Sequence, residues 1–139
     1  NHIMCSMIQK RQIDITEFSA DLWMNSDALK TLHGDGHVIG LHSHTHPTDM
    51  SKLSYSEQEY QYSTNYKILY DLLGEKPVTM SHPCNAYNNE TLSILESLNI
   101  EIGFRANMAE HQRCQFEFPR EDHANIMRKI ENEDNCIHQ

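Results

Sequence analysis

The stretch Gly36-His37-Val38-Ile39-Gly40-Leu41-His42-Ser43-His44-Thr45-His46-Pro47 decides the fold prediction. Its first half is apolar, and the residues 38–41 suit a buried strand. Its second half is a histidine-rich turn, and α/β folds place their sites where a buried strand ends. Because Pro47 disfavours helical geometry at His46, an extended chain would put His42, His44 and His46 on one side.

These histidines predict a site for one metal ion. The chain has 10 histidines in 139 residues, and His33 and His37 lie just before the same turn. A catalytic zinc site usually has three protein ligands and an open position, so two histidines need a third ligand, often a carboxylate, from elsewhere. The alternative from the residues alone is an exposed polar turn.

Helices and strands alternate on both sides of this stretch. Capping residues and glycines bound the helices, and apolar alternation marks the strands. Four helices are predicted. The first begins at Asn25 or Ser26 and is stopped by Gly34 and Gly36, and the second runs from the capping box Ser54-x-x-Glu57 to Gly74. The third is capped by Asn88 or Asn89, and the fourth by Asp122. The predicted strands are 38–41, 78–80, 100–104 and 116–118, and the polar tail after Glu131 is expected to fray.

Composition narrows the class of protein. Eleven Lys plus Arg against 20 Asp plus Glu give 11 − 20 = −9, and no basic cluster exceeds Lys10-Arg11, so we expect no nucleic-acid partner. No apolar run reaches the roughly 18 residues of a membrane span. The 4 cysteines are scattered without a C-x-x-C pair, which favours reduced thiols and a cytoplasmic location. The length predicts a single domain over 1–139.

The stretch from Gly36 to Pro47 resembles the second signature of the polysaccharide deacetylases, carbohydrate esterase family four, where G-H-E-I-G-x-H-[ST]-x-x-H is common. His42 and His46 match the two metal-binding histidines of that signature. The resemblance therefore implies a divalent metal, expected to be zinc. His37 matches a histidine that usually packs behind the strand and His44 a variable position, so neither is assigned as a ligand.

The loop from Ser81 to Asn88 resembles the third signature of the same family, often R-P-P-[YF]-G-x-Y-N. Ser81 stands where that pattern has arginine, and Cys84 where it has an aromatic residue. The resemblance implies that the backbone N–H near Cys84 faces the oxyanion, and that Pro83 and Tyr87 contact the substrate. Taken alone, the loop is simply a turn.

The segment Phe118-Pro119-Arg120-Glu121-Asp122-His123 resembles an L-P-R-x-D segment of part of the superfamily. Arg120 is expected to supply the cation that Ser81 cannot, because an arginine beside a carboxylate lowers the pKa and fixes the orientation of a catalytic base. A surface salt bridge is the competing explanation. His123 is a candidate proton donor to the leaving amine, since the unperturbed pKa of histidine lies near neutrality.

The resemblance covers roughly residues 20 to 130 and implies an α/β fold, a partial (β/α) barrel of the polysaccharide deacetylase type with outer helices. Family members carry an aspartate pair, typically F-D-D-G, after the first strand, and it supplies the general base and the third metal ligand. Nothing before His42 matches this pair, and Asp14 is isolated. We therefore expect the first strand to lie upstream of Asn1.

The implied function is metal-dependent hydrolysis of an N-acetyl, or less often O-acetyl, group on a carbohydrate, with an N-acetylated sugar or glycan as partner. Two alternatives remain. The unmatched aspartate pair supports a catalytically inactive relative that binds a glycan, a metal or a partner protein. A histidine-rich metal-binding protein with no role on sugars is the third hypothesis.

Overall fold

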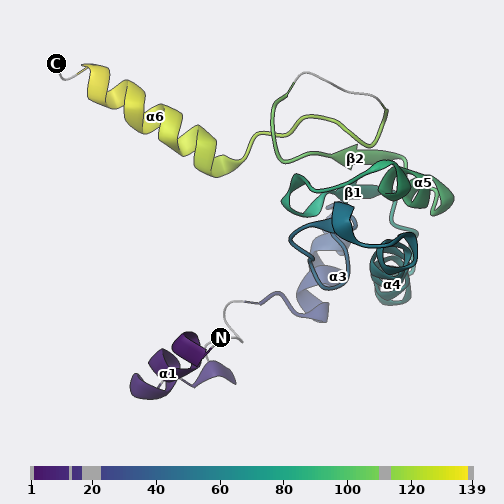
Figure 1. Cartoon of the computed structure of the whole chain (residues 1–139), viewed down its shortest axis with the longest axis horizontal. Coiled ribbons are helices and arrows are strands. Elements are labelled where there is room, and N and C mark those ends of the chain that lie inside the picture. Colours follow the sequence, from purple (N-terminus) through teal and green to yellow (C-terminus); the bar gives the residue numbers. More distant parts are fainter. Residues whose placement is uncertain (1, 13, 17–22, 110–113, 138–139) are drawn as a thin grey trace. The chain divides into compact units, whose positions relative to one another are not determined.

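The computed structural model describes residues 2–12, 14–16, 23–109 and 114–137 (Figure 1). The chain divides into two compact units, Asn1–His37 and Val38–Gln139, and we describe each by itself. The single domain predicted for residues 1–139 stays a prediction. No helix in the described part of the chain combines the length and the apolar character that a bilayer crossing demands.

The first unit contains α1 (His2–Lys10), which the sequence patterns did not predict, and α3 (Ser26–Gly34). α3 begins as predicted, because the Asn25 side chain accepts a hydrogen bond from a backbone N–H of the first turn. Beyond its end, Gly36 has a φ of 90°, a left-handed conformation that glycine adopts without steric cost. The predicted stop signal is therefore confirmed.

Two longer helices of the second unit are α4 (Tyr55–Leu73) and α5 (Asn89–Ser97), and single 3-10 turns occupy Met50–Lys52 and Pro83–Asn85. α4 opens with the predicted capping box and ends at Gly74, whose φ is 75°. α5 opens with the Asn88 side chain accepting from the Thr91 backbone N–H at 3.0 Å. Local capping chemistry thus sets both helices.

Short parallel pairings form the sheet. β1 (Thr79–Ser81) pairs with β2 (Ile102–Phe104) in parallel, with Met80 opposite Gly103. Single parallel bridges extend it on both sides, Leu41 to Met80 and Phe104 to Phe118. Four segments therefore lie side by side in the order of the sequence. Parallel neighbours need crossover connections, and α4 and α5 lie in the first two of them (Figure 1).

The strand predicted over 38–41 is wrong in extent, because only Leu41 pairs. Its N–H donates to the Thr79 carbonyl at 2.8 Å, and its carbonyl accepts from the Ser81 N–H at 2.9 Å. Val38 is 71% exposed. The apolar run suggested burial along its whole length, whereas the backbone comes alongside β1 only at Gly40 and Leu41. A Cβ at Gly40 would lie 2.8 Å from the Thr79 carbonyl oxygen.

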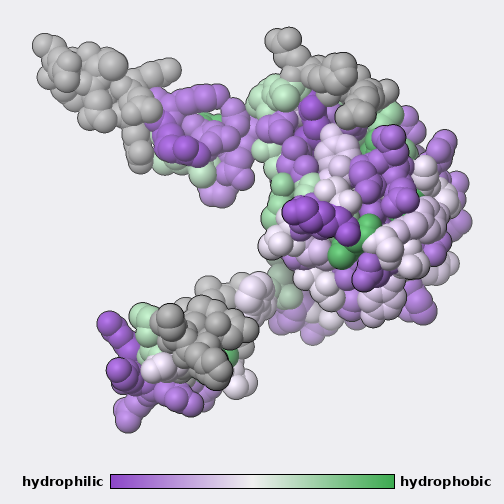
Figure 2. Space-filling view, in the orientation of Figure 1, coloured by the Kyte–Doolittle hydropathy of each residue, from purple (hydrophilic) through white to green (hydrophobic). Residues whose placement is uncertain are grey.

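The core of the second unit lies between the sheet and its two helices. Its buried apolar members are Leu41, Met50, Tyr62, Leu69, Met80, Ile94, Leu95, Ile100 and Phe116. α4 also turns polar side chains inward, with Gln58 at 0% and Gln61 at 9% exposure. On the face drawn in Figure 2, the surface of this unit is mostly hydrophilic with isolated apolar residues.

The last element of the second unit is α6 (His123–Ile137). Asp122 caps it as predicted, since its Oδ1 accepts from the Ala124 backbone N–H at 2.8 Å. The helix continues past Glu131 to Ile137, and the fraying of the tail stays a prediction. No glycine or proline interrupts that stretch, so the polar composition alone does not end the helix.

Candidate metal centre

His42 leaves the sheet directly after Leu41, and two hydrogen bonds fix it. Its backbone N–H donates to Asn65 Oδ1 at 2.9 Å, and its Nδ1 lies 2.9 Å from the Ser81 carbonyl oxygen. A carbonyl oxygen only accepts, so Nδ1 carries the proton and Nε2 keeps its lone pair. A hydrogen bond of this kind commonly orients a metal-ligating histidine, with the other ring nitrogen facing the ion.

A tight turn brings His46 back to His42. Ser43 and His46 have φ angles of 67° and 54°, in the left-handed region. The His46 N–H donates to Ser43 Oγ at 3.1 Å, which closes the turn. The two rings lie with their centroids 4.9 Å apart, tilted by 59°. The extended conformation expected for this segment is wrong, because the reversal at these residues, rather than strand alternation, brings the rings together.

His44 takes a different direction. Its ring meets Tyr60 of α4 edge-on, with 6.0 Å between centroids. Its backbone N–H and that of Thr45 both donate to Gln61 Oε1, at 3.2 and 2.8 Å. Gln61 and Asn65 therefore hold the turn from α4. Sequence reasoning missed both residues, although the polar positions 58, 61 and 65 recur at the same helical spacing as the apolar Tyr62 and Leu69, which is a usable signal.

The pair of histidines fits two of the ligands that a divalent metal requires. Both rings are exposed, and the proton on His42 Nδ1 leaves Nε2 as a donor atom. Within the described ranges, no group of three histidine, cysteine, aspartate or glutamate side chains is placed to hold a metal ion. The described residues thus provide two of the three protein ligands that a catalytic zinc site usually has.

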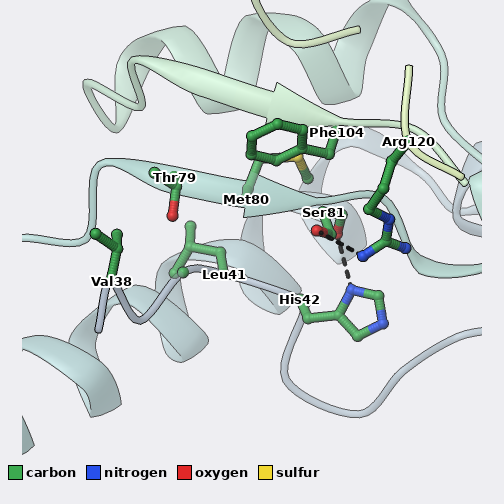
Figure 3. Close-up of a pocket in the computed structure, with 9 residues that line it drawn as sticks. Val38, Leu41, His42, Thr79, Met80, Ser81, Phe104 and Arg120 are labelled. Carbon is green, nitrogen blue, oxygen red and sulfur yellow. Dashed lines mark hydrogen bonds between the residues drawn. The ribbon is translucent and has the colours of Figure 1, made fainter. Parts of the chain in front are cut away.

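A pocket of about 350 Å³ opens beside His42 and runs along β1 (Figure 3). Arg120 lines it, and the guanidinium lies beside Ser81 and His42 in Figure 3. Its Nη1 donates to Ser81 Oγ at 3.4 Å, while the Ser81 carbonyl accepts from His42. Ser81 therefore connects the arginine to the histidine. The structure brings Arg120 to the same pocket as His42.

Buried polar groups hold the loop after β1. His82 is 1% exposed, and its Nε2 donates to the Phe116 carbonyl at 2.8 Å. Burial lowers the pKa of His82 to about 4, so the ring is neutral. The ring stacks on Tyr87 with 3.9 Å between centroids, and the Tyr87 hydroxyl donates to Glu117 Oε1 at 2.8 Å. Sequence reasoning assigned no role to His82 or Glu117.

The remaining predicted site residues lie in different settings. Pro83 is buried, and Cys84 is exposed in a turn with a φ of 50°. The His123 side chain is 93% exposed and 3.5 Å from the Asp122 carboxylate at the start of α6. It is not among the residues that line the pocket beside His42.

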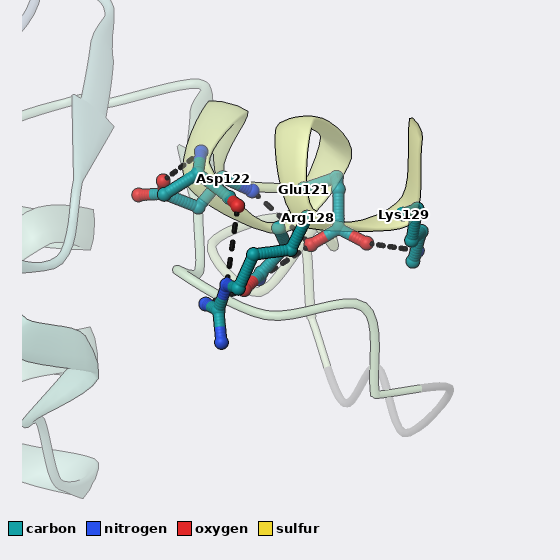
Figure 4. A network of polar contacts seen from close by, with 6 residues as sticks. Glu121, Asp122, Arg128 and Lys129 are labelled. Carbon is teal, nitrogen blue, oxygen red and sulfur yellow. Dashed lines mark hydrogen bonds and ion pairs between the residues drawn. The ribbon is translucent and has the colours of Figure 1, made fainter. Parts of the chain in front are cut away.

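The neighbours of His123 form a separate polar network (Figure 4). Glu121 accepts from Lys129 Nζ and from Asn125 Nδ2, each at 2.8 Å. The hydrogen bond from Lys129 is the main cause of a pKa of Glu121 below its usual range. These contacts fix the first turns of α6, at whose start His123 lies.

Comparison with known proteins gives a family and a fold. The family model described as polysaccharide deacetylase matches residues 3–103. It starts earlier and ends sooner than the predicted resemblance, so Arg120 and His123 lie beyond it. The uncharacterized protein YlxY of Bacillus subtilis (strain 168) is 31% identical over 93 residues, which cover 66% of this chain and 29% of that protein.

Similar solved structures include the following three. The Streptococcus pyogenes deacetylase PplD, in complex with acetate, has a TM-score of 0.63 at 20% identity over 71% of this chain and 45% of its own. The BpsB deacetylase domain of Bordetella bronchiseptica has a TM-score of 0.60 at 12% identity, over 73% of this chain and 49% of its own. BA3943 of Bacillus anthracis, a CE4 family pseudoenzyme, has a TM-score of 0.52 at 21% identity, over 55% of this chain and 27% of its own. The chain thus spans less than half the length of each, and the predicted partial (β/α) barrel is confirmed.

Proposed function

We propose that this chain, which belongs to the polysaccharide deacetylase family, provides two ligands of a divalent metal site that removes N-acetyl, or less often O-acetyl, groups from a carbohydrate. The observation that carries the proposal is the pairing of His42 with His46. The hydrogen bond from His42 Nδ1 to the Ser81 carbonyl directs Nε2 away from the sheet. The centroids of the His42 and His46 rings are 4.9 Å apart.

His42 and His46 would hold a divalent cation, zinc in our proposal, which when bound would supply Lewis-acid polarisation of the acyl carbonyl and activation of water at neutral pH. The residues of the chain then have supporting roles. The backbone N–H near Cys84 donates to the developing oxyanion. Arg120, which lines the pocket beside His42, orients the carboxylate of the general base. His123 gives a proton to the leaving amine, and Tyr87 contacts the sugar. Pro83 is buried, so it shapes the loop rather than contacting the sugar.

A specific observation favours a second candidate, a non-catalytic domain that binds a glycan, a metal or a partner protein. Ser81 occupies the position where the resemblance expects arginine, and the described residues hold no third ligand close to the two histidines. A base and a complete ligand set are both needed for turnover. The cytoplasmic location belongs to the proposal as well, and it rests on the wide scatter of the cysteines.

Acetate release from N-acetylated chito-oligosaccharides separates the two candidates. The zinc-loaded chain and its His46→Asn variant are compared, with His44→Asn as the matched control. The deacetylase proposal expects release once the chain is joined to a preceding strand that carries the F-D-D-G aspartate pair, equal release by the His44→Asn variant of that joined chain, and a loss of about 100-fold or more in its His46→Asn variant. Zinc binding without measurable release from the joined chain would support the non-catalytic candidate instead.

A further inference from the structure

We propose that Gln61 of α4 is a positioning residue, which holds the two histidine rings face to face before any ion binds. The inference rests on the proposed function for its consequence, a change in the affinity of this pair for a divalent metal. Three hydrogen bonds carry it. Gln61 Oε1 accepts from the His44 and Thr45 N–H groups at 3.2 and 2.8 Å, and its Nε2 donates to Thr45 Oγ1 at 2.8 Å.

The turn from His42 to His46 needs support from outside itself. Ser43 and His46 have φ angles of 67° and 54°, in the region where a residue with a Cβ is disfavoured. Conformations with negative φ compete with this backbone, and they carry His46 away from His42. The bond from the His46 N–H to Ser43 Oγ at 3.1 Å lies within the turn, so it does not fix the turn against the rest of the unit.

α4 gives that support at two points. Gln61 and Asn65 are four residues apart, so they lie on one face of the helix. Asn65 Oδ1 accepts from the His42 N–H at 2.9 Å, where the chain leaves the sheet. Gln61 holds the middle of the turn up to Thr45, the residue before His46. Both ends of the segment that carries the two rings are therefore set by one helix.

The Gln61 side chain suits this role. It is 9% exposed, so water has little access to replace its bonds. A primary amide has acceptor and donor groups, and here the oxygen serves two backbone N–H groups while the nitrogen serves a hydroxyl. An apolar side chain at position 61 would leave these groups without their partner, and the turn would open towards water. Metal binding would then include the cost of closing the turn, so the affinity would fall.

The first test needs no metal. In the zinc-free 139-residue chain, the Thr45 amide should exchange its hydrogen about tenfold faster in Gln61→Met than in the parent chain. The nuclear Overhauser signal between the His42 and His46 rings should weaken in the same variant. Methionine has about the length of glutamine but lacks its amide, so the packing of α4 is kept while the bonds to the turn are lost.

Gln58→Met is the matched control. Gln58 is 0% exposed on the same helix, but it bonds to the Leu53 carbonyl and to the Thr91 hydroxyl rather than to the histidine turn. This variant should lose stability in urea unfolding and still keep the parent exchange rate at Thr45. A residue that merely stabilises the fold would not distinguish the two methionine variants in this way.

The second test is calorimetric titration with zinc. The affinity should fall about tenfold or more in Gln61→Met and stay within about twofold of the parent in Gln58→Met. Asn65→Leu, which removes the acceptor of the His42 N–H, is the second variant and should also lower the affinity.

Parent-like exchange at Thr45 in Gln61→Met would overturn the proposal, and so would zinc affinities that fall equally in both methionine variants or in neither. A zinc affinity of the parent chain that does not depend on His42 and His46 would instead count against the proposed function. The exchange measurement without metal still decides the role of Gln61 in that case.

Discussion

His42 and His82 are two histidines on either side of Ser81 in the fold, and burial gives them different chemistry. His42 is exposed and keeps Nε2 available because Nδ1 is bonded to the Ser81 carbonyl. His82 is 1% exposed and donates through Nε2 to the Phe116 carbonyl. Both follow pairing segments of the sheet, so the sequence pattern alone could not separate a candidate ligand from a buried structural residue.

The buried His82 predicts a dependence of stability on pH. Its folded pKa is about 4, below the ordinary 6.5, so the unfolded state binds more protons between these values. The contribution of the neutral ring is complete above pH 6.5 and declines as the pH falls towards 4, by roughly 3 kcal/mol in the free energy of unfolding. Urea unfolding at several pH values should show this loss, and His82→Gln should flatten the curve. An unchanged curve would contradict the assignment.

Tyr87 and Glu117 give a second prediction at this scale. Tyr87→Phe keeps the ring that stacks on His82 but removes the hydroxyl that donates to the 1% exposed Glu117. Loss of a donor to a buried carboxylate should lower the free energy of unfolding by about 1–3 kcal/mol. Urea unfolding at pH 7 measures it, with Tyr55→Phe as the exposed control. A change within the error of that control would show that the hydrogen bond contributes little.

At the scale of elements, local signals predicted the helices better than the strands. The capping box at Ser54, the Asn88 cap and the glycines after α3 and α4 act within one turn, so the sequence displays them directly. Strand pairing depends on distant partners. Of the apolar residues 38–41, only Leu41 pairs with β1, and the missing side chain of Gly40 leaves room for the close approach to Thr79.

The close packing of Gly103 against the Phe116 backbone predicts that a larger side chain at position 103 destabilises the sheet. An added Cβ at Gly103 in β2 would lie 2.7 Å from the Phe116 carbonyl oxygen, and backbone atoms there cannot move aside cheaply. Gly103→Ala should therefore destabilise the second unit by about 1–3 kcal/mol. Gly34→Ala is the control, because a Cβ at Gly34 meets nothing within 4 Å. Thermal unfolding followed by circular dichroism compares them, and equal midpoints would refute the close contact.

At the scale of the whole molecule, the sequence predicted which histidines meet but not how they meet. The spacing of His42 and His46 and the resemblance together identified the pair. The turn that joins them depends on left-handed residues and on Gln61 and Asn65 of α4, which no histidine pattern encodes. The buried His82 and Glu117 became visible only through their long-range packing. Arg120 reaches the pocket from a segment beyond the family match.

The most direct test is calorimetric titration of the metal-free 139-residue chain with zinc at pH 7.5. The account predicts one ion per chain, an affinity at least about tenfold lower in His42→Asn and in His46→Asn, and an affinity within about twofold of the parent in His44→Asn. Unchanged affinity in His42→Asn or His46→Asn, or a loss in His44→Asn as large as theirs, would contradict it.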